Sequence, residues 1–475
     1  DPLSQREYFR LFAFFNTQDE SSLESASPED LAAREVLRAA VRPRQDELDA
    51  RAAQLTPGFA AWETALTTEA RSSLPLEVRN VLGLRPEQRT EKQRTVALQG
   101  FFAIDAEYQA LQERLRQATR GGPRIPTTLV LSERTEPRPS FLFIKGDFTR
   151  RGDPVAPGTP EILPPLKRAS PDDAPPNRMD LARWLVNPAH PLTSRVMINR
   201  IWQQYFGRGL VETENDFGTQ GSQPSHPELL DWLATEFAGV PPADNLSPWS
   251  LKHLHRLIVT SATYRQSSAE DSSAPASNSR KDIDPLNRLL SRQNRIRLEG
   301  EIVRDVALAA SGQMSRTVGG PPVFPPQPDG VMALGQSRRE WKTSEGADRY
   351  RRGLYTFRWR ATPHPALSVF DTPDAFSACT RRLRSNTPLQ ALTLLNDEAF
   401  LDLAERLADR LIHEAPPADR LNLAFQICLA RTPTADERKR LQSLLDAERG
   451  AGDERMAWTT LSRVLLNLDE TITRE

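Results

Sequence analysis

The hydrophobic residues of this chain recur mostly at the spacing of an α-helix. Near the amino terminus, Tyr8, Leu11, Phe12 and Phe15 follow an i, i+3, i+4, i+7 pattern, which places them on one helix face. Helices so close to a chain terminus fray unless they are docked, so we expect this face to pack against another surface. The pattern therefore predicts a docked helix at the start of the chain.

Residues 21–122 are predicted to form a helical hairpin or a small bundle. The stretch is rich in Ala, Leu, Glu, Arg and Gln, all of which are good helix formers. Proline residues mark expected breaks between helices near positions 43, 57, 75 and 86. Its charges alternate in sign, which is typical of a solvated helix surface, although a protein-binding face would look similar.

Signals for helix starts are clear in residues 177–475. Ser225 with Glu228, and Thr434 with Glu437, fit the capping box, in which two side chains satisfy free backbone N–H groups reciprocally. We therefore predict that helices begin just after Ser225 and just after Thr434.

Two more signals in the same region set helix boundaries. Thr387 followed by Pro388 fits an N-cap with proline at the first helical position. A stripe of apolar residues over 298–311 predicts a helix that ends at Gly312, since glycine readily adopts the left-handed cap conformation. Residues 177–475 are thus predicted to be a helical carboxy-terminal domain.

A small β element is expected between these helical parts. The runs 127–131 and 141–144 are short, β-branched or aromatic, and predict strands. A proline-rich stretch follows as far as Pro176, so we interpret residues 123–176 as short strands followed by an extended strap. Later in the chain, residues 354–357 read as a strand, and residues 267–280 as a polar loop.

The predicted fold class is therefore mainly α, with multi-helix domains and a small β element around residues 125–150. A length of 475 residues is enough for several packed units. Lys and Arg total 62 against 63 for Asp and Glu, so there is no global basic surface for nucleic acid. The sequence also lacks an apolar run long enough to span a membrane, so neither nucleic acid nor a membrane is an expected partner.

The two cysteines, Cys379 and Cys428, permit at most one disulfide, and the sequence leaves open whether they pair. Neither stands in a C-x-x-C-H or C-x-x-C motif, so we expect no haem attached to this chain and no zinc site. The six histidines include one close pair, His253 and His255, whose spacing on a helix does not suit a shared ion. We therefore expect no metal centre, and the catalytic residues, if any exist, remain unknown.

Polar residues inside apolar stretches give the candidate functional site. Arg and Asn residues in such stretches need partners, and bidentate arginine–carboxylate pairs could lock adjacent helices together. The same arginines could instead line a cleft for an anionic ligand, and the sequence does not separate these two interpretations. The candidate residues for this polar network or anionic cleft are Arg195, Asn199, Arg200, Asp216, His226, Asp231, Arg381 and Arg382.

Some of these residues carry more specific expectations. We expect Arg200, Arg381 and Arg382 to be at least half buried and paired. His226 precedes Pro227 at an expected helix start, where a structural role is favoured. An alternative function is an uncharacterised enzyme, active for example on polysaccharide, that uses carboxylates such as Asp216, Glu228 and Asp231 as acid and base. The sequence does not decide whether the protein is an enzyme.

Several long stretches together resemble a known family. They include DPLSQREYFRLFAFFNTQDE (1–20), NRMDLARWLVNPAHPLTSRVMINRIWQQYFGRGLVETENDFGTQG (177–221), PSHPELLDWLATEF (224–237) and RRLRSNTPLQALTLLNDEAF (381–400). In this order they are similar to the planctomycete cytochrome C-associated proteins, in which the tail of domain of unknown function 1549 precedes domain of unknown function 1553. The resemblance covers nearly the whole chain, although Thr471 stands where the family usually has Phe.

The resemblance implies a secreted or periplasmic protein whose parent transfers electrons. In that family a C-x-x-C-H haem motif commonly precedes the segment matching residues 1–20, so these residues are expected to be the tail of an upstream haem-associated domain. No cofactor is then expected in this chain, and haem c is expected in the region before it. The implied partners are the upstream cytochrome domain of the same protein and a redox partner or an extracellular polymer. The family supplies no established reaction.

Overall fold

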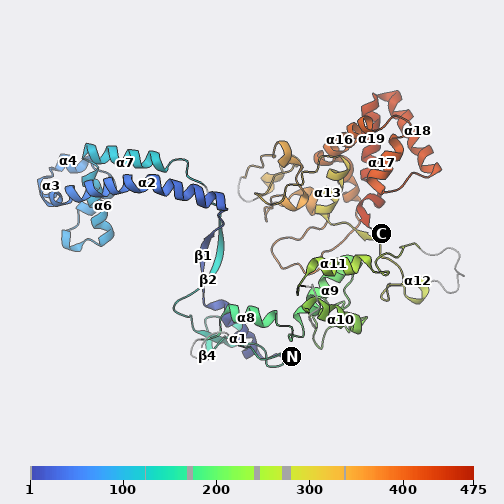
Figure 1. The fold of residues 1–475 in the computed structure, drawn as a ribbon, viewed down its shortest axis with the longest axis horizontal. Helices are drawn as coiled ribbons and strands as arrows, with labels where there is room; N and C mark the ends of the chain where they lie inside the picture. The colour runs from blue at the N-terminus through green and yellow to red at the C-terminus, as the bar shows by residue number, and fades with distance from the viewer. Residues whose placement is uncertain are drawn as a thin grey trace. The chain divides into compact units, whose positions relative to one another are not determined.

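The computed structural model describes residues 3–123, 125–167, 175–239, 247–269, 280–335 and 339–474. The chain divides into two compact units (Figure 1). The first unit consists of Asp1–Pro160 with Ser170–Arg178, and the second of Glu161–Ala169 with Met179–Glu475. The described residues are mainly helical with only small two-stranded sheets, which confirms the predicted mainly α fold class.

The first unit begins with helix α1 (Gln5–Asn16). A capping box between Ser4 and Glu7 stabilises the start of this helix. Its buried side chains are Phe9, Ala13 and Phe14, and the Phe9 ring meets Phe143 edge-on at 5.1 Å. The face predicted from the sequence, which carries Tyr8, Leu11, Phe12 and Phe15, is not the more buried one, and of these four residues Leu11 is the one that is partly buried. Aromatic residues lie on both sides of this helix, and the side that contacts strand β3 (Ser140–Phe143) is the one carrying Phe9. Tyr8 is 65 % exposed, and Phe12 and Phe15 are also exposed.

A two-stranded ribbon and a helical arm follow. Strand β1 (Gln18–Glu24) pairs antiparallel with β2 (Thr127–Glu133), and the chain between them forms the arm (Figure 1). In the arm, α2 (Pro28–Leu55) packs along α7 (Ala106–Thr119), as the hairpin prediction requires. The shorter elements of the arm are η1 (Thr56–Gly58), α3 (Phe59–Ala65), α4 (Thr68–Ser72), α5 (Leu76–Leu82), η2 (Pro86–Gln88) and α6 (Glu91–Phe102).

Two details of the first unit differ from prediction. Helix α2 continues through Pro43 instead of breaking there. The extended stretch also contains one more strand than expected: η3 (Ile144–Gly146) turns the chain from β3 into β4 (Arg151–Val155), which pairs antiparallel with β3. The predicted strap reaches Pro176, but its residues 168–174 lie outside the described residues.

The first part of the second unit is a small helical cluster. Its helices are α8 (Arg178–Leu185), α9 (Thr193–Phe206), α10 (Pro227–Ala238), α11 (Leu251–Thr260) and α12 (Arg280–Ile283). Helices α9, α10 and α11 share a core in which Ile198, Phe206, Leu233 and Leu254 are almost fully buried. The predicted polar loop at 267–280 falls mostly on residues 270–279, which lie outside the described residues.

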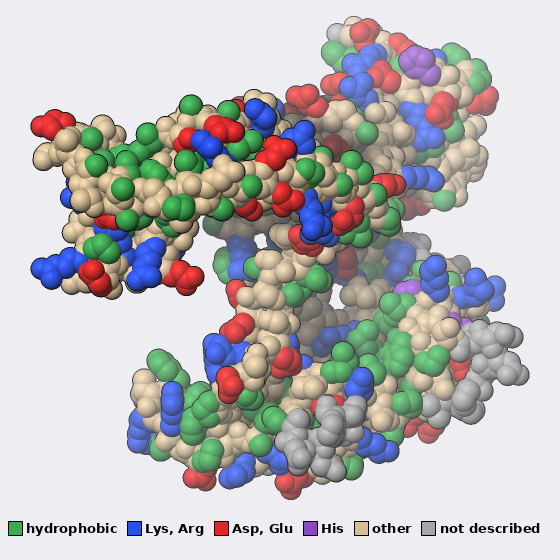
Figure 2. Space-filling view, turned by 60° about the vertical axis from the view of Figure 1, so that its left-hand side comes forward, with side chains coloured by type: hydrophobic (Ala, Val, Ile, Leu, Met, Phe, Trp, Pro, Cys, Tyr) green, Lys and Arg blue, Asp and Glu red, His purple; other side chains and the backbone are tan. Residues whose placement is uncertain are grey.

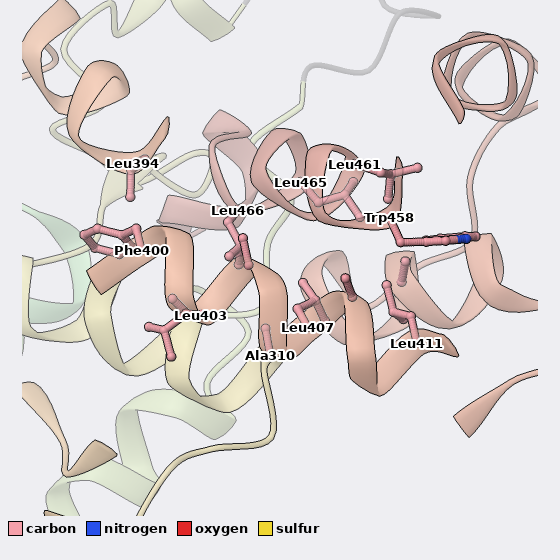
Figure 3. Close-up of a cluster of buried hydrophobic side chains, with 14 of the residues drawn as sticks. Ala310, Leu394, Phe400, Leu403, Leu407, Leu411, Trp458, Leu461, Leu465 and Leu466 are labelled. Carbon is pink, nitrogen blue, oxygen red and sulfur yellow. The ribbon is translucent and has the colours of Figure 1, made fainter. Parts of the chain in front are cut away.

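The second part of this unit holds the largest hydrophobic core. Figure 3 shows this cluster of buried side chains, which includes Leu403 and Leu407 of α16 and Leu461 and Leu465 of α19. Each fully buried side chain of this kind contributes about 1.5–3 kcal/mol of stability. The elements are β5 (Ile296–Arg297), α13 (Gly300–Ala310), η5 (Val331–Leu334), η6 (Gly346–Tyr350), η7 (Gly353–Tyr355), α14 (Pro365–Ser368), α15 (Pro388–Asn396), α16 (Glu398–Glu414), α17 (Arg420–Leu429), α18 (Ala435–Ala451), α19 (Glu454–Leu466), η8 (Asp469–Ile472) and β6 (Thr473–Arg474).

Two of the predicted helix starts are confirmed and one is wrong. The capping box of Thr434 and Glu437 is confirmed, and Thr387 is the N-cap of α15 with proline next to it. The box at Ser225 is wrong, because the N-cap of α10 is His226. The Ser225 hydroxyl instead lies 3.0 Å from His226 Nδ1, and its backbone N–H donates to the Leu210 carbonyl.

The ends of two further elements can also be compared. Helix α13 is followed by Gly312 in the left-handed conformation, as predicted. The predicted strand at 354–357 is present only as an isolated bridge between Thr356 and Val323. The short helix η7 takes up its first residues, and there Asp305 Oδ1 accepts the Gly353 N–H at 2.7 Å.

Charge on the surface is mixed. Figure 2 shows Lys and Arg interspersed with Asp and Glu over the face it presents, in keeping with the near-zero net charge. Among the described residues, no helix is both long enough and apolar enough to cross a membrane.

Candidate functional site

A cleft of about 530 Å³ in the second unit is lined by several arginines. We call it the arginine cleft. Arg208, Arg295, Arg297 and Arg384 line it together with a single carboxylate, that of Asp469. Positive charges in the lining therefore outnumber negative ones, which favours an anionic ligand. The remaining side chains of the lining are polar or apolar: Phe206, Leu286, Asn294, Ile296, Ser385, Asn386 and Thr473.

The walls of the cleft come from distant parts of the sequence. Strand β5 pairs with β6, so that Arg297 lies opposite Thr473. Arg474 donates to the backbone carbonyls of Gln204 and Tyr205, at the end of α9. These contacts bring the end of α9, strand β5 and the segment after α19 to one place.

Asp469 bridges two of the arginines. Its Oδ2 accepts a hydrogen bond from Arg295 Nη2 at 2.7 Å, and its Oδ1 accepts one from Arg297 Nη2 at 3.2 Å. The Thr473 hydroxyl also donates to Oδ1 at 3.2 Å. Asp469 is nevertheless 52 % exposed, so it faces solvent while it holds the two guanidinium groups.

Arg384 is one of the weakly paired arginines of the cleft. Its nearest carboxylate, Glu299, lies 3.6 Å away, and its Nε is buried without a hydrogen-bond partner among the described residues. Burial lowers the pKa of this guanidinium, and Glu299 opposes that effect. A buried donor without a partner is costly, and an anionic group in the cleft would relieve that cost.

The backbone beside Arg384 is held by neighbouring polar groups. Asp371 Oδ2 accepts hydrogen bonds from both the backbone N–H and the hydroxyl of Ser385, each at 2.7 Å. Gln390 Nε2 donates to the Val369 carbonyl and to the Ser385 hydroxyl. This wall of the cleft is therefore fixed before any ligand binds.

The structure does not bring the predicted site residues together in one cleft. Arg195 Nε pairs with Asp231 Oδ1 at 2.6 Å and joins α9 to α10, which is a structural link of the kind considered from sequence. Arg195 also holds the pKa of Asp231 below its ordinary value. Asp216 Oδ1 accepts the Gly218 N–H and stabilises a turn. His226 is the N-cap residue of α10, although its side chain makes no capping hydrogen bond.

Asn199 is fully buried and has a clear structural role. Its Nδ2 donates to the Val211 carbonyl at 2.9 Å, and its Oδ1 accepts the Val211 N–H at 2.8 Å. The side chain thus replaces a backbone partner for a segment that has no strand beside it.

The three arginines that were expected to be buried and paired behave differently from one another. The prediction is wrong for Arg200, which is exposed because it lies on the side of α9 away from the core. Arg381 is half exposed and lies 3.9 Å from Glu214. Arg382 is partly buried and pairs with Glu301 at 2.6 Å and with Glu299 at 3.2 Å.

The four arginines of the cleft were missed from the sequence. Arg295 and Arg297 are two residues apart, a spacing that places side chains on one face of an extended strand. Arg384 lies only two residues beyond Arg382. These signals are too common to have identified the cleft without knowledge of the pairing between β5 and β6.

Metal and cysteine chemistry contribute little to the site. Across the described ranges, no group of three or more His, Cys, Asp or Glu residues is arranged to hold a metal ion. Cys379 and Cys428 are both free thiols, which answers the question of whether they pair. Burial raises the pKa of the Cys428 thiol to about 12, so it is unreactive at neutral pH.

Residues 177–445 match the family described as PSD1, protein of unknown function (DUF1553). This match covers more than half of the chain, so the chain belongs to the DUF1553 family, as the family resemblance indicated for this part. All four arginines of the cleft lie within the matched residues. No curated protein and no solved structure matches the chain.

Proposed function

We propose that this chain is a docking module of a larger extracytoplasmic protein, and that the arginine cleft binds an anionic ligand. The observation that carries the proposal is the excess of arginine over carboxylate in one cleft of about 530 Å³. Guanidinium groups bind carboxylate, sulfate and phosphate through paired, charge-assisted hydrogen bonds. Pockets of this volume are of the size that binds organic ligands.

The alternative of an enzyme acting through carboxylates has weaker support. Glycoside-type chemistry needs one carboxyl group with a raised pKa as the acid. Asp231, one of the candidate residues, has its pKa lowered by Arg195. The side chain of Asp216 is engaged in a local turn.

The family resemblance adds the context of electron transfer. In this proposal the parent protein is periplasmic or extracellular and carries haem c before this chain, and the chain positions that haem domain near a redox partner or an extracellular polymer. The exposed aromatic side chains Tyr8, Phe12 and Phe15 of α1 are the surface that we assign to the upstream haem domain. The arginine cleft then binds the partner or polymer.

Anion binding by purified protein tests the proposal. Citrate and sulfate, titrated at low ionic strength, should bind the wild-type chain, and Arg295→Ala should weaken citrate binding about tenfold, since hydrogen bonds to charged groups contribute about 1.5–3 kcal/mol. Arg295 is suited to substitution because its side chain is 49 % exposed. Isothermal titration calorimetry measures the change.

Arg200→Ala is the matched control, because it removes an exposed arginine of the same unit that does not line the cleft. It should bind citrate as the wild type does. Equal losses in the two variants would mean that general surface charge attracts the anion, and the cleft would have to be abandoned as the site.

A further inference from the structure

We infer that the ligand of the arginine cleft is an acidic polysaccharide, and that one of its carboxylate or sulfate groups replaces the Asp469 carboxylate between Arg295 and Arg297. This inference rests on the proposed function and names the ligand class for the same cleft. Asp469 then acts as an internal competitor that occupies the anion position while the cleft is empty.

The geometry at Asp469 identifies the position of the anionic group. Two guanidinium groups converge on one carboxylate, at 2.7 Å from Arg295 and at 3.2 Å from Arg297. Two donors fixed around one acceptor form a binding position for any carboxylate or sulfate of similar size. The position is therefore already built, and its present occupant belongs to the chain itself.

The side chain of Asp469 can leave this position without disturbing the core. Its backbone begins the short helix η8, and the next residues anchor that helix: Thr471 and Ile472 are buried, and the Thr471 hydroxyl donates to the Leu465 carbonyl at 2.6 Å. The Asp469 side chain itself is 52 % exposed and is held by surface hydrogen bonds. The Arg295–Asp469 pair is about half exposed on both sides, and exposed ion pairs contribute only about 0–1 kcal/mol. Arg297 is only 12 % exposed, so it needs an anionic group in place of Asp469, which the ligand supplies.

The rest of the lining favours a sugar acid over a nucleic acid. Asn386 and Thr473 add an amide and a hydroxyl, which suit the hydroxyl groups of a sugar chain. Binding of single-stranded nucleic acid relies on aromatic side chains on which bases stack. Among the described residues of the lining, the one aromatic side chain is Phe206, which is only 1 % exposed and offers no ring face to a ligand.

The size of the cleft points to a ligand larger than an inorganic ion. A volume of about 530 Å³ holds more than a single sulfate or phosphate, and Arg384 offers a second, weakly paired guanidinium besides the Arg295–Arg297 position. A polymer that repeats its acidic groups can engage both positions at once, and this multiplies the affinity.

The test compares polymers on the full chain and on two variants. The polysaccharide probes are polygalacturonate, which carries carboxylates, dextran sulfate, which carries sulfates, and neutral dextran. Oligothymidylate and polyglutamate are the polyanions of other classes. Asp469→Asn removes the internal competitor and should tighten binding of the preferred acidic polymer about three- to tenfold. Asp409→Asn is the matched control: Asp409 also pairs with an arginine at 2.7 Å, but it lies on α16 and does not line the cleft.

The possible results distinguish failure of this inference from failure of the proposed function. Tighter binding by Asp469→Asn with unchanged binding by Asp409→Asn supports the inference, and the tighter of the two acidic polymers identifies the acidic group. Unchanged or weaker binding by Asp469→Asn overturns the anion position. Oligothymidylate or polyglutamate bound as tightly as the polysaccharides overturns the ligand class. Citrate binding without any polymer binding overturns this inference alone, whereas loss of all anion binding overturns the proposed function as well.

Discussion

At the scale of single residues, Asn199 and Arg200 show how neighbouring polar side chains acquire opposite roles. Asn199→Ala should lower the free energy of unfolding by about 2–4 kcal/mol, because both the N–H and the carbonyl of Val211 would lose their buried partner. Arg200→Ala, one residue away and exposed, should change it by no more than about 0.5 kcal/mol. Urea unfolding of the two variants measures both values. Similar losses would contradict the structural role assigned to Asn199.

His364 makes stability depend on pH. Burial lowers its pKa from 6.5 to about 4, while its Nε2 donates to the Pro326 carbonyl at 2.9 Å. On acidification, His364 is protonated first in the unfolded state. The stability that neutral His364 gives the folded protein is therefore complete above pH 6.5 and is lost as the pH falls toward 4. When the pH is lowered from 7 to 4.5, the free energy of unfolding should therefore fall by about 2 kcal/mol less in His364→Gln than in the wild type.

Urea unfolding at the two pH values measures this difference, and the comparison removes the contribution of other titrating groups that both proteins share. His190 is one of these groups, because burial lowers its pKa too. Equal pH dependence in the wild type and in His364→Gln would show that His364 does not titrate as its burial requires.

At the scale of elements, α1 carries the clearest surface for a partner. If a haem domain precedes this chain in the parent protein, as we propose, it should cover Tyr8, Phe12 and Phe15, which together expose a large apolar area. Hydrogen–deuterium exchange should then show slower amide exchange over residues 5–16 in a longer chain that includes the upstream domain than in residues 1–475 alone. Identical exchange in both proteins would remove the proposed interface. Residues 91–102 of α6, in the helical arm, provide an internal reference that should not change.

The sequence predicted elements well where local chemistry determines them. The capping box at Thr434 and the proline after Thr387 marked helix starts that the structure confirms, because caps depend on residues within one turn. The face of α1 could not be predicted, since aromatic residues lie on both sides and the choice depends on Phe143, more than a hundred residues away. At Ser225, a bond from its backbone to Leu210 competed with the capping box.

At the scale of the whole molecule, the cleft depends on pairing between parts of the chain that no local pattern connects. Arg474 reaches the carbonyl of Gln204 across 270 residues, and Arg295 reaches Asp469 across 174. The sequence identified arginines as candidates for anion binding but named those at 195, 200, 381 and 382, because apolar neighbours drew attention to them. Which arginines share a cleft is determined by the pairing of β5 with β6, and two-residue strands leave almost no signal in a sequence.

The distance between Arg297 and its carboxylate has a consequence for synthesis of the protein. Asp469 is made 172 residues after Arg297, which takes roughly 10–35 s at ribosomal rates of 5–20 residues per second. During this interval the growing chain carries Arg295 and Arg297 without their internal counter-charge. Arg295 and Arg297 therefore gain their contacts with Asp469 only after the last helices of the chain have been made.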